Sequence, residues 1–142
     1  MNTTFRRTTE QDINALKTFG ISTLLPFLQN NCAYGFTAIC ENCVVGFAYG
    51  YFLIDPIHGR KIFYLHSIDI FNGYRGVGRG KAFMSYIRDY VLSNGFDEIF
   101  LATNIGNVTM DGICNELGAT RNADDDVIYE WRRQADASTE DH

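Results

Sequence analysis

The chain of 142 residues has no apolar run long enough to cross a bilayer as a helix. The longest run, Cys43 to Ile54, falls well short of the roughly 20 residues that a membrane-spanning helix needs. Residues 1–10 contain two arginines but no apolar stretch after them, so they do not resemble a signal peptide. These absences predict a cytoplasmic protein without a membrane partner.

Positive charge is also scarce. The chain carries 12 Lys and Arg against 17 Asp and Glu, which gives a net charge of −5. Such a surface disfavours nucleic acid and anionic membranes as partners, and it favours a cationic small substrate. The length predicts one domain with a core that needs no disulfides. We place this domain at residues 1–133, followed by a polar tail at 134–142.

Cysteines are few, and their spacing excludes the usual metal and redox motifs. Of the four cysteines, Cys40 and Cys43 form a CxxC pair, but no second pair stands at the spacing of a zinc site. The pair also lies between two strand-like runs instead of at a helix start, where a redox motif belongs. We therefore expect no metal, and a hairpin turn at Glu41-Asn42 with reduced thiols beside it.

Apolar periodicity and turn residues predict the order of the elements. Thr8 and Gln11 form a capping box that starts a first helix, and Pro26 lies in the first turn of a second. Strands are expected at residues 3–7, 34–40, 43–54, 61–71, 96–103 and 127–131, and further helices at 24–29, 81–94 and 107–117. This order indicates a mixed α/β domain.

The stretch from Arg75 to Gly80, which reads Arg-Gly-Val-Gly-Arg-Gly, joins a predicted strand to a predicted helix. Such a turn aims backbone N–H groups and the positive end of a helix dipole at one point, where phosphate oxygens bind. It is not a Walker loop, because Ala82 stands where a Ser or Thr is needed. It is not a Rossmann fingerprint either, because the third glycine falls one residue early.

The pattern Arg75-x-x-Gly78-x-Gly80 resembles the acyl-CoA pyrophosphate loop, [QR]-x-x-G-x-[GA], of the GNAT N-acetyltransferase superfamily. The preceding Leu65-x-x-Ile68-x-Ile70 and the later run from Asn107 to Ala119 look like that family's apolar strand and last helix. The resemblance implies an α/β fold with a mixed, mostly antiparallel sheet of about six or seven strands, flanked by about four helices. It also implies acetyl-CoA as cosubstrate, bound where the fourth and fifth strands separate.

The resemblance assigns roles along the cofactor. Backbone groups of residues 68–70 are expected to pair with the pantetheine arm, and an N–H near Ile70 to polarise the thioester. The pyrophosphate is expected on the loop amides, with Arg75 or Arg79 adding charge. The expected cofactor-binding residues are Ile68, Asp69, Ile70, Arg75, Gly76, Val77, Gly78, Arg79, Gly80 and Asn107.

Acetyl transfer to an amine needs a base for the amine and, in many enzymes, an acid for the leaving thiolate. Ser67 stands where many relatives carry a carboxylate, so the candidate base is Asp69, with Tyr64 and His66 as weaker candidates. Cys114 stands where many relatives carry a tyrosine. It is either the proton donor or, as we favour, a small core residue of the last helix.

The acidic run Asp124, Asp125 and Asp126 precedes the last predicted strand. Together with that strand it resembles the ending of aminoglycoside 3-N-acetyltransferases of type I. Clustered carboxylates suit a substrate with several ammonium groups. We therefore expect these residues, with Tyr64, to bind the acceptor, and Asp126 to take part in catalysis.

The predicted function is acetyl transfer to an aminoglycoside amine, favouring the 3-N position. The product is less cationic and binds anionic RNA less well, which amounts to antibiotic resistance. Two alternatives stay open. One is the same reaction on a polyamine or a protein N-terminus, and the other is a non-catalytic acyl-CoA-binding module. The resemblance also suggests a homodimer, because relatives often form one.

Overall fold

A computed structural model describes residues 2–121 and 129–133. Its elements are β1 (Thr3–Arg7), a 3-10 turn (Glu10–Asp12), α1 (Ile13–Lys17), α2 (Leu24–Leu28), β2 (Ala33–Cys40), β3 (Cys43–Asp55), β4 (Arg60–Ile70), α3 (Arg79–Ser93), β5 (Glu98–Phe100) and α4 (Val108–Glu116). No helix in this part of the chain is long and apolar enough to cross a membrane.

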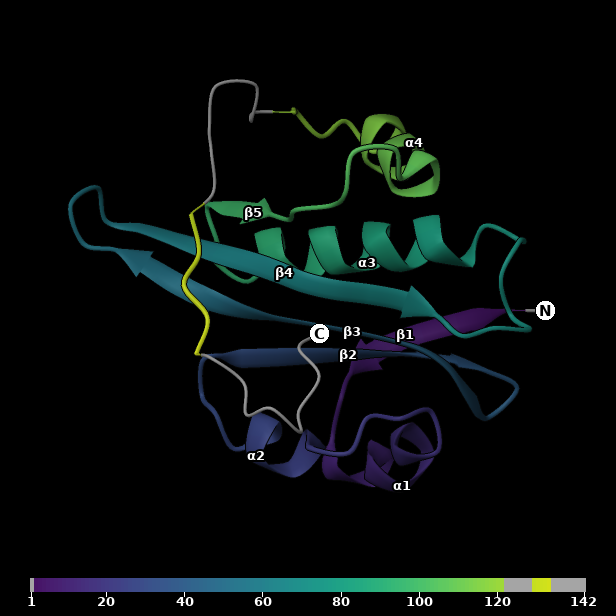
Figure 1. Cartoon of the computed structure of the whole chain (residues 1–142). Helices are drawn as coiled ribbons and strands as arrows, with labels where there is room; N and C mark the ends of the chain where they lie inside the picture. The colour runs from purple at the N-terminus through teal and green to yellow at the C-terminus, as the bar shows by residue number, and fades with distance from the viewer. Residues whose placement is uncertain (1, 122–128, 134–142) are drawn as a thin grey trace.

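The strands form one sheet in the order β1-β2-β3-β4-β5. Strands β1 to β4 pair antiparallel with one another, whereas β5 runs parallel to β4. Helices α3 and α4 lie on one side of the sheet, and α1 and α2 lie on the other (Figure 1). The predicted mixed α/β architecture is therefore confirmed, with five strands in the described residues instead of six or seven.

The largest differences from the predicted elements lie late in the chain. The strand expected at 96–103 is shortened to Glu98–Phe100, because the backbone leaves β4 after that point. Residues 129–131, the described part of the expected last strand, are not in a strand. Tyr129 and Trp131 are 80% and 92% exposed, so neither side chain has a core to pack against.

The first helical turn begins one residue later than predicted. Asp12 Oδ2 accepts a hydrogen bond from the N–H of Thr9 at 2.9 Å, so the capping pair is Thr9 and Asp12. Thr8 is buried instead, and its hydroxyl lies 2.8 Å from that of Thr37 on β2. Tertiary packing decided between two adjacent threonines with equal capping propensity.

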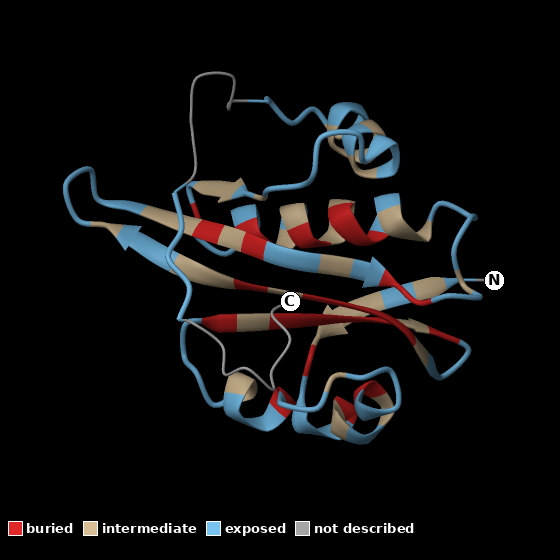
Figure 2. Ribbon diagram, viewed as in Figure 1, coloured by how far each residue is buried: buried red, intermediate tan, exposed pale blue. Residues whose placement is uncertain are grey.

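The main core lies between the sheet and α3. Helix α3 places Phe83, Met84, Ile87 and Val91 on one face, and all four are buried. They pack with buried side chains of the central strands, and Figure 2 shows the buried segments of α3 and of these strands in red. Burying each such side chain stabilises the fold by about 1.5–3 kcal/mol.

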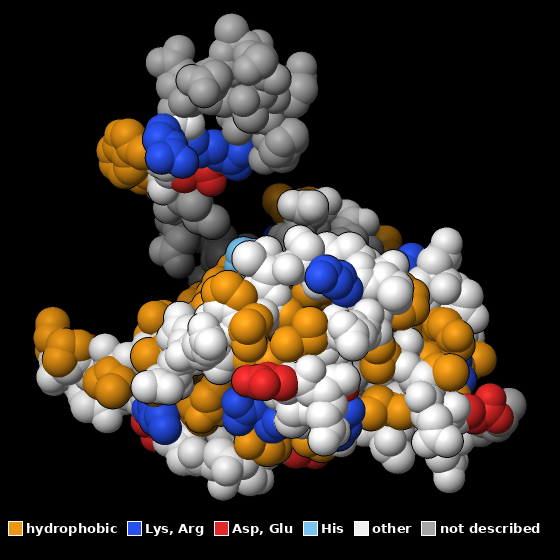
Figure 3. All heavy atoms as spheres, turned by 90° about the horizontal axis from the view of Figure 1, so that it is seen from below, with side chains coloured by type: hydrophobic (Ala, Val, Ile, Leu, Met, Phe, Trp, Pro, Cys, Tyr) orange, Lys and Arg blue, Asp and Glu red, His pale blue; other side chains and the backbone are white. Residues whose placement is uncertain are grey.

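The opposite face of the sheet has a smaller core. Leu16 of α1 and Leu24 of α2 are buried against Phe47 of β3 and Phe71, the residue after β4. Figure 3 shows this face from outside. Hydrophobic and uncharged groups cover more of it than carboxylates do.

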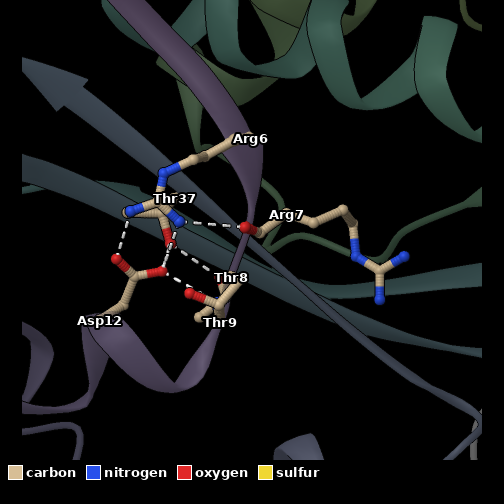
Figure 4. A network of polar contacts seen from close by, with 6 residues as sticks. All are labelled: Arg6, Arg7, Thr8, Thr9, Asp12 and Thr37. Carbon is tan, nitrogen blue, oxygen red and sulfur yellow. Dashed lines mark hydrogen bonds and ion pairs between the residues drawn. The ribbon is translucent and has the colours of Figure 1, made fainter.

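A buried polar network joins β1 to the first helical turn (Figure 4). The Asp12 carboxylate is 3% exposed and accepts two hydrogen bonds from the Arg6 guanidinium, at 2.5 and 2.7 Å. It also accepts from Thr9 N–H and, at 3.4 Å, from the Thr37 hydroxyl. The hydrogen bond from Arg6 to Asp12 and the negative charge of Asp12 raise the pKa of Arg6, although partial burial opposes this.

Candidate active site

A cleft opens where β4 and β5 separate. The two strands pair only from Ile62 to Tyr64 of β4, opposite β5, and then diverge. The cleft has a volume of about 190 Å³. Its walls are residues 65–68 of β4, residues 101–103 after β5, and Asn107 and Met110 at the start of α4. The gap expected between the fourth and fifth strands is therefore present.

A β-bulge shapes the β4 wall of this cleft. Gly50 of β3 pairs with Leu65, but the preceding Tyr49 pairs with Ser67, so His66 is an extra residue in β4. A bulge bends its strand and turns a side chain to a different face. Ser67 and the ring of His66 consequently both lie on the face of Tyr49.

The glycine loop has the features of an anion site. Gly76 and Gly78 have φ values of +92° and +80°, which favour glycine, and a Cβ at either position would meet open space. Helix α3 starts at Arg79, so the positive end of its dipole lies at the loop. Among the described residues, no partner is found for the backbone N–H groups from Gly76 to Lys81. The loop thus presents unpaired donors at its surface.

The two loop arginines are held differently. Arg79 uses its guanidinium within the fold, donating to the Thr3 hydroxyl and to the Tyr74 carbonyl, both at 2.8 Å. Arg75 donates from Nε to the Ile70 carbonyl at 2.5 Å and from Nη2 to a carboxylate oxygen of Asp69 at 2.9 Å. Its side chain is 58% exposed, so it is the arginine that a ligand can reach.

The three expected residues at the end of β4 lie on different surfaces. Ile68 lines the cleft and Ile70 is buried in the main core. Asp69 is exposed on the other face, opposite Phe47 of β3, and its carboxylate is ion-paired with Arg75. The predicted base is therefore outside the set of residues that form the cleft walls.

Two expected residues belong to α4. Asn107 is at the cleft and caps the helix, because its Oδ1 accepts from Met110 N–H and its Nδ2 donates to Thr103 Oγ1, both at 3.1 Å. Cys114 is half-buried and is not one of the described residues that line the cleft. Burial, and secondarily the charge of Asp111, raises the pKa of the Cys114 thiol, so it stays protonated at neutral pH.

The expected acceptor residues divide into two groups. Tyr64 is beside the cleft, where its ring stacks on Phe100 at 5.0 Å and its hydroxyl lies 2.9 Å from Nδ1 of His66. The acidic run 124–126, including the candidate catalytic Asp126, lies outside the described residues. His66 lines the cleft although the sequence ranked it low, because only the separation of β4 from β5 shows that it lies at an open edge.

Three solved structures share this fold across nearly the whole chain. A ribosomal-protein-alanine N-acetyltransferase from Brucella melitensis biovar Abortus 2308 is 17% identical with a TM-score of 0.74, covering 92% of this chain and 100% of that one. The aminoglycoside acetyltransferase meta-AAC0020 from an uncultured soil metagenomic sample, solved with sisomicin, is 17% identical with a TM-score of 0.75, covering 94% and 97%. AAC(6')-Iy, solved with the bisubstrate analogue CoA-S-monomethyl-acetylneamine, is 15% identical with a TM-score of 0.74, covering 95% and 100%.

These identities establish likeness of fold and leave the acceptor open. No curated protein sequence is significantly similar to the chain. A family model described as acetyltransferase (GNAT) family matches residues 5–118, most of the chain. The expected fold and the expected acetyl-CoA cosubstrate both agree with that match. The chain belongs to the acetyltransferase (GNAT) family.

Proposed function

We propose that the protein transfers the acetyl group of acetyl-CoA to a primary amine. The observation that carries the proposal is that β4 connects the cleft to the glycine loop. The cleft between β4 and β5 is adjacent to the strand that leads, after Ile70, into a loop with unpaired amides from Gly76 to Lys81. An extended ligand with a diphosphate and a long amide-containing arm has matching requirements at both places.

The loop residues Gly76, Val77, Gly78 and Gly80 would hold the diphosphate through backbone donors. Arg75 would add a charge-assisted hydrogen bond by moving from Asp69 to a phosphate oxygen. Arg79 would contribute by fixing the loop, since its donors bind Thr3 and Tyr74.

The rest of the cofactor would follow β4. Backbone groups of residues 68–70 would pair with the pantetheine arm, while the side chain of Ile68 and that of Asn107 form part of the cleft wall. A backbone N–H near Ile70 would donate to the thioester oxygen, where negative charge develops during attack.

For the acceptor we propose an aminoglycoside amine, with the 3-N position as the specific hypothesis. Two of the fold neighbours described above are aminoglycoside acetyltransferases. The residues suited to a polycation are Asp124, Asp125 and Asp126, and they lie outside the described part of the chain. The face of the molecule drawn in Figure 3, on the side of α1 and α2, shows few carboxylates, and the proposal therefore assigns recognition of several ammonium groups to that acidic run.

A protein N-terminus is the second candidate acceptor. The specific observation in its favour is the aromatic surface beside the cleft, formed by Phe27, Tyr49, Tyr51 and Tyr64. The first three rings contact one another, and the ring of Tyr64 contacts His66, which also contacts Tyr49. Aromatic faces bind a single ammonium group and adjacent apolar side chains. One of the fold neighbours also acts on a ribosomal protein, as its name states.

The test is release of the coenzyme A thiol from acetyl-CoA in the presence of kanamycin, gentamicin, spermidine or an alanine-initiated peptide. We expect turnover with the aminoglycosides, located by mass spectrometry and NMR of the product at the 3-amine. Asp126→Asn should raise KM for aminoglycosides but leave a peptide reaction unchanged. Tight binding of acetyl-CoA by calorimetry without thiol release for any amine would instead identify a non-catalytic module.

A further inference from the structure

We infer that His66 takes the proton from the acceptor amine and that Tyr64 positions its imidazole. The inference rests on the proposed acetyl transfer and names a residue of the same site. It replaces Asp69 as the candidate base for the reaction.

His66 is the one imidazole among the described cleft-lining residues. The other lining side chains on β4 are Leu65, Ser67 and Ile68, and those from the opposite wall are equally non-basic. An imidazole has an ordinary pKa of about 6.5, which suits a general base at physiological pH. An amine that enters the cleft therefore meets one conventional base in the described structure.

The register of β4 places this side chain on the face of Tyr49 and Tyr51, because His66 stands two residues after Tyr64, which pairs with Tyr51. In a regular strand, neighbouring side chains alternate between faces, so His66 and Ser67 would point to opposite sides. The extra residue brings Ser67 onto the face that His66 already occupies, and the imidazole lies beside Tyr49, with ring centroids 5.2 Å apart. Gly50 opposite the bulge has no room for a side chain, since a Cβ there would lie 2.1 Å from the Tyr64 carbonyl oxygen.

Hydrogen bonding prepares the imidazole for proton transfer. Tyr64 Oη lies 2.9 Å from Nδ1 of His66. When Nδ1–H donates to the phenol oxygen, Nε2 carries the lone pair, and the described residues offer Nε2 no hydrogen-bond partner. The Tyr64 ring is itself fixed by stacking on Phe100 at 5.0 Å. The arrangement is that of a base, an orienting group and a support for that group.

Asp69 is less suited to the same task. Its carboxylate binds Arg75 at 2.9 Å and is outside the described cleft walls. Asp69 therefore serves to hold Arg75 at the loop.

The reaction balances with one base. Nε2 of His66 accepts a proton from the ammonium group, and the neutral amine attacks the thioester carbonyl carbon. The new C–N bond forms and the C–S bond breaks. The second amine proton goes to the leaving thiolate, which departs as coenzyme A thiol, and His66 returns its proton to solvent. The net products are the amide, the free thiol and one proton.

The ionisable groups that face His66 in the described structure are phenols. Tyr49 comes from β3 and Tyr64 from β4, while α2 contributes the non-ionisable Phe27 behind Tyr49. Burial, with the nearby phenols of Tyr51 and Tyr64, raises the pKa of Tyr49, so that ring stays neutral. The charged pair Asp69 and Arg75 lies farther along the same strand.

The experiment compares H66Q with H58Q across pH, using the amine from the test panel that the wild-type protein acetylates fastest. His58 is the matched control, because it pairs with Asp55 in the β3–β4 turn, away from the cleft. We expect kcat/KM of H66Q at pH 7 to fall by about 10²–10⁴-fold. The loss should shrink as the pH approaches the pKa of the acceptor amine, because more of the amine is then already deprotonated and needs no base before it attacks. H58Q should match wild type.

Y64F provides a second readout. We expect Y64F to lose less kcat than H66Q and to shift the midpoint of the ascending limb when kcat/KM is plotted against pH. Its affinity for acetyl-CoA, measured by calorimetry, should be unchanged. A pH-independent effect of H66Q, or turnover within about threefold of wild type, would overturn the role of His66. If H66Q does not fold, an unshifted profile for Y64F overturns it. Failure of the wild-type protein to release thiol with every amine would instead contradict the proposed function.

Discussion

Two Arg–Asp pairs in this protein look alike in sequence and differ in environment. Asp12 is 3% exposed, and it accepts two hydrogen bonds from Arg6 and others from Thr9 and Thr37. Asp69 is 51% exposed and makes one contact with Arg75, itself 58% exposed. The first pair joins two elements of the fold, whereas the second lies at the glycine loop.

The difference shows how one interaction type serves stability in one place and function in another. Hydrogen bonds to a buried charged group such as the Asp12 carboxylate contribute about 1.5–3 kcal/mol each, although Arg6 itself is 41% exposed. An exposed pair contributes about 0–1 kcal/mol, so a ligand phosphate can displace Asp69 from Arg75 at little cost. The N-terminal region is therefore fixed, and the loop is able to exchange partners.

The largest effect is expected from Asp12→Asn. The change weakens the hydrogen bonds that the buried carboxylate accepts from Arg6, Thr9 and Thr37, and we expect a loss of about 3 kcal/mol in the free energy of unfolding. Urea denaturation followed by circular dichroism measures it. Asp69→Asn is the matched control and should change stability by less than about 1 kcal/mol. Equal losses in the two variants would contradict the comparison.

The second largest loss of stability is expected from a substitution at Gly50, opposite the β-bulge of β4. Gly50→Ala would force its Cβ against the Tyr64 carbonyl, and we expect about 1–3 kcal/mol of destabilisation, measured by thermal and urea unfolding. Gly112→Ala in α4 is the control, because a Cβ there meets no atom within 4 Å. It should be neutral or stabilise by up to about 1 kcal/mol. A neutral Gly50→Ala would show that the bulge tolerates a side chain.

The loop arginines should separate binding from stability. Arg75→Ala removes an exposed donor, so we expect about tenfold weaker coenzyme A binding by calorimetry, with unfolding almost unchanged. Arg79→Ala removes contacts to Thr3 and Tyr74 and should lower stability by about 1–3 kcal/mol. If Arg79→Ala reduced affinity without loss of stability, the assignment of the two arginines would be reversed.

The smallest expected effect is a difference in the rate at which the cysteine thiols are alkylated. Because the pKa of Cys114 is raised, its reactive thiolate appears only at higher pH than in an ordinary cysteine. We expect iodoacetamide at pH 8 to modify Cys114 more slowly than the exposed Cys32 and Cys43, as measured by peptide mass mapping. The difference should narrow as the pH rises. Faster modification of Cys114 would indicate an activated thiol.

Local patterns in the sequence were enough to locate most of the fold. The strands β1 to β4 and helix α3 lie within two residues of the predicted bounds, since their apolar periodicity is strong. The glycine loop was also predictable, because Gly76 and Gly78 adopt left-handed φ values that few other residues tolerate. The shortened β5 was not, because its end depends on where β4 turns away from it.

Local pattern alone determined the element order, the glycine loop and the family resemblance, because propensity, turn chemistry and short motifs are properties of neighbouring residues. Tertiary structure decided which candidates meet at the cleft. The pairing of β3 with β4 set the bulge, and a one-residue change in register reverses the face of every later side chain. The face of His66 beside Tyr49 and Tyr64 follows from the pairing before the bulge, whereas the bulge moved Asp69 to the face of Phe47, where it pairs with Arg75.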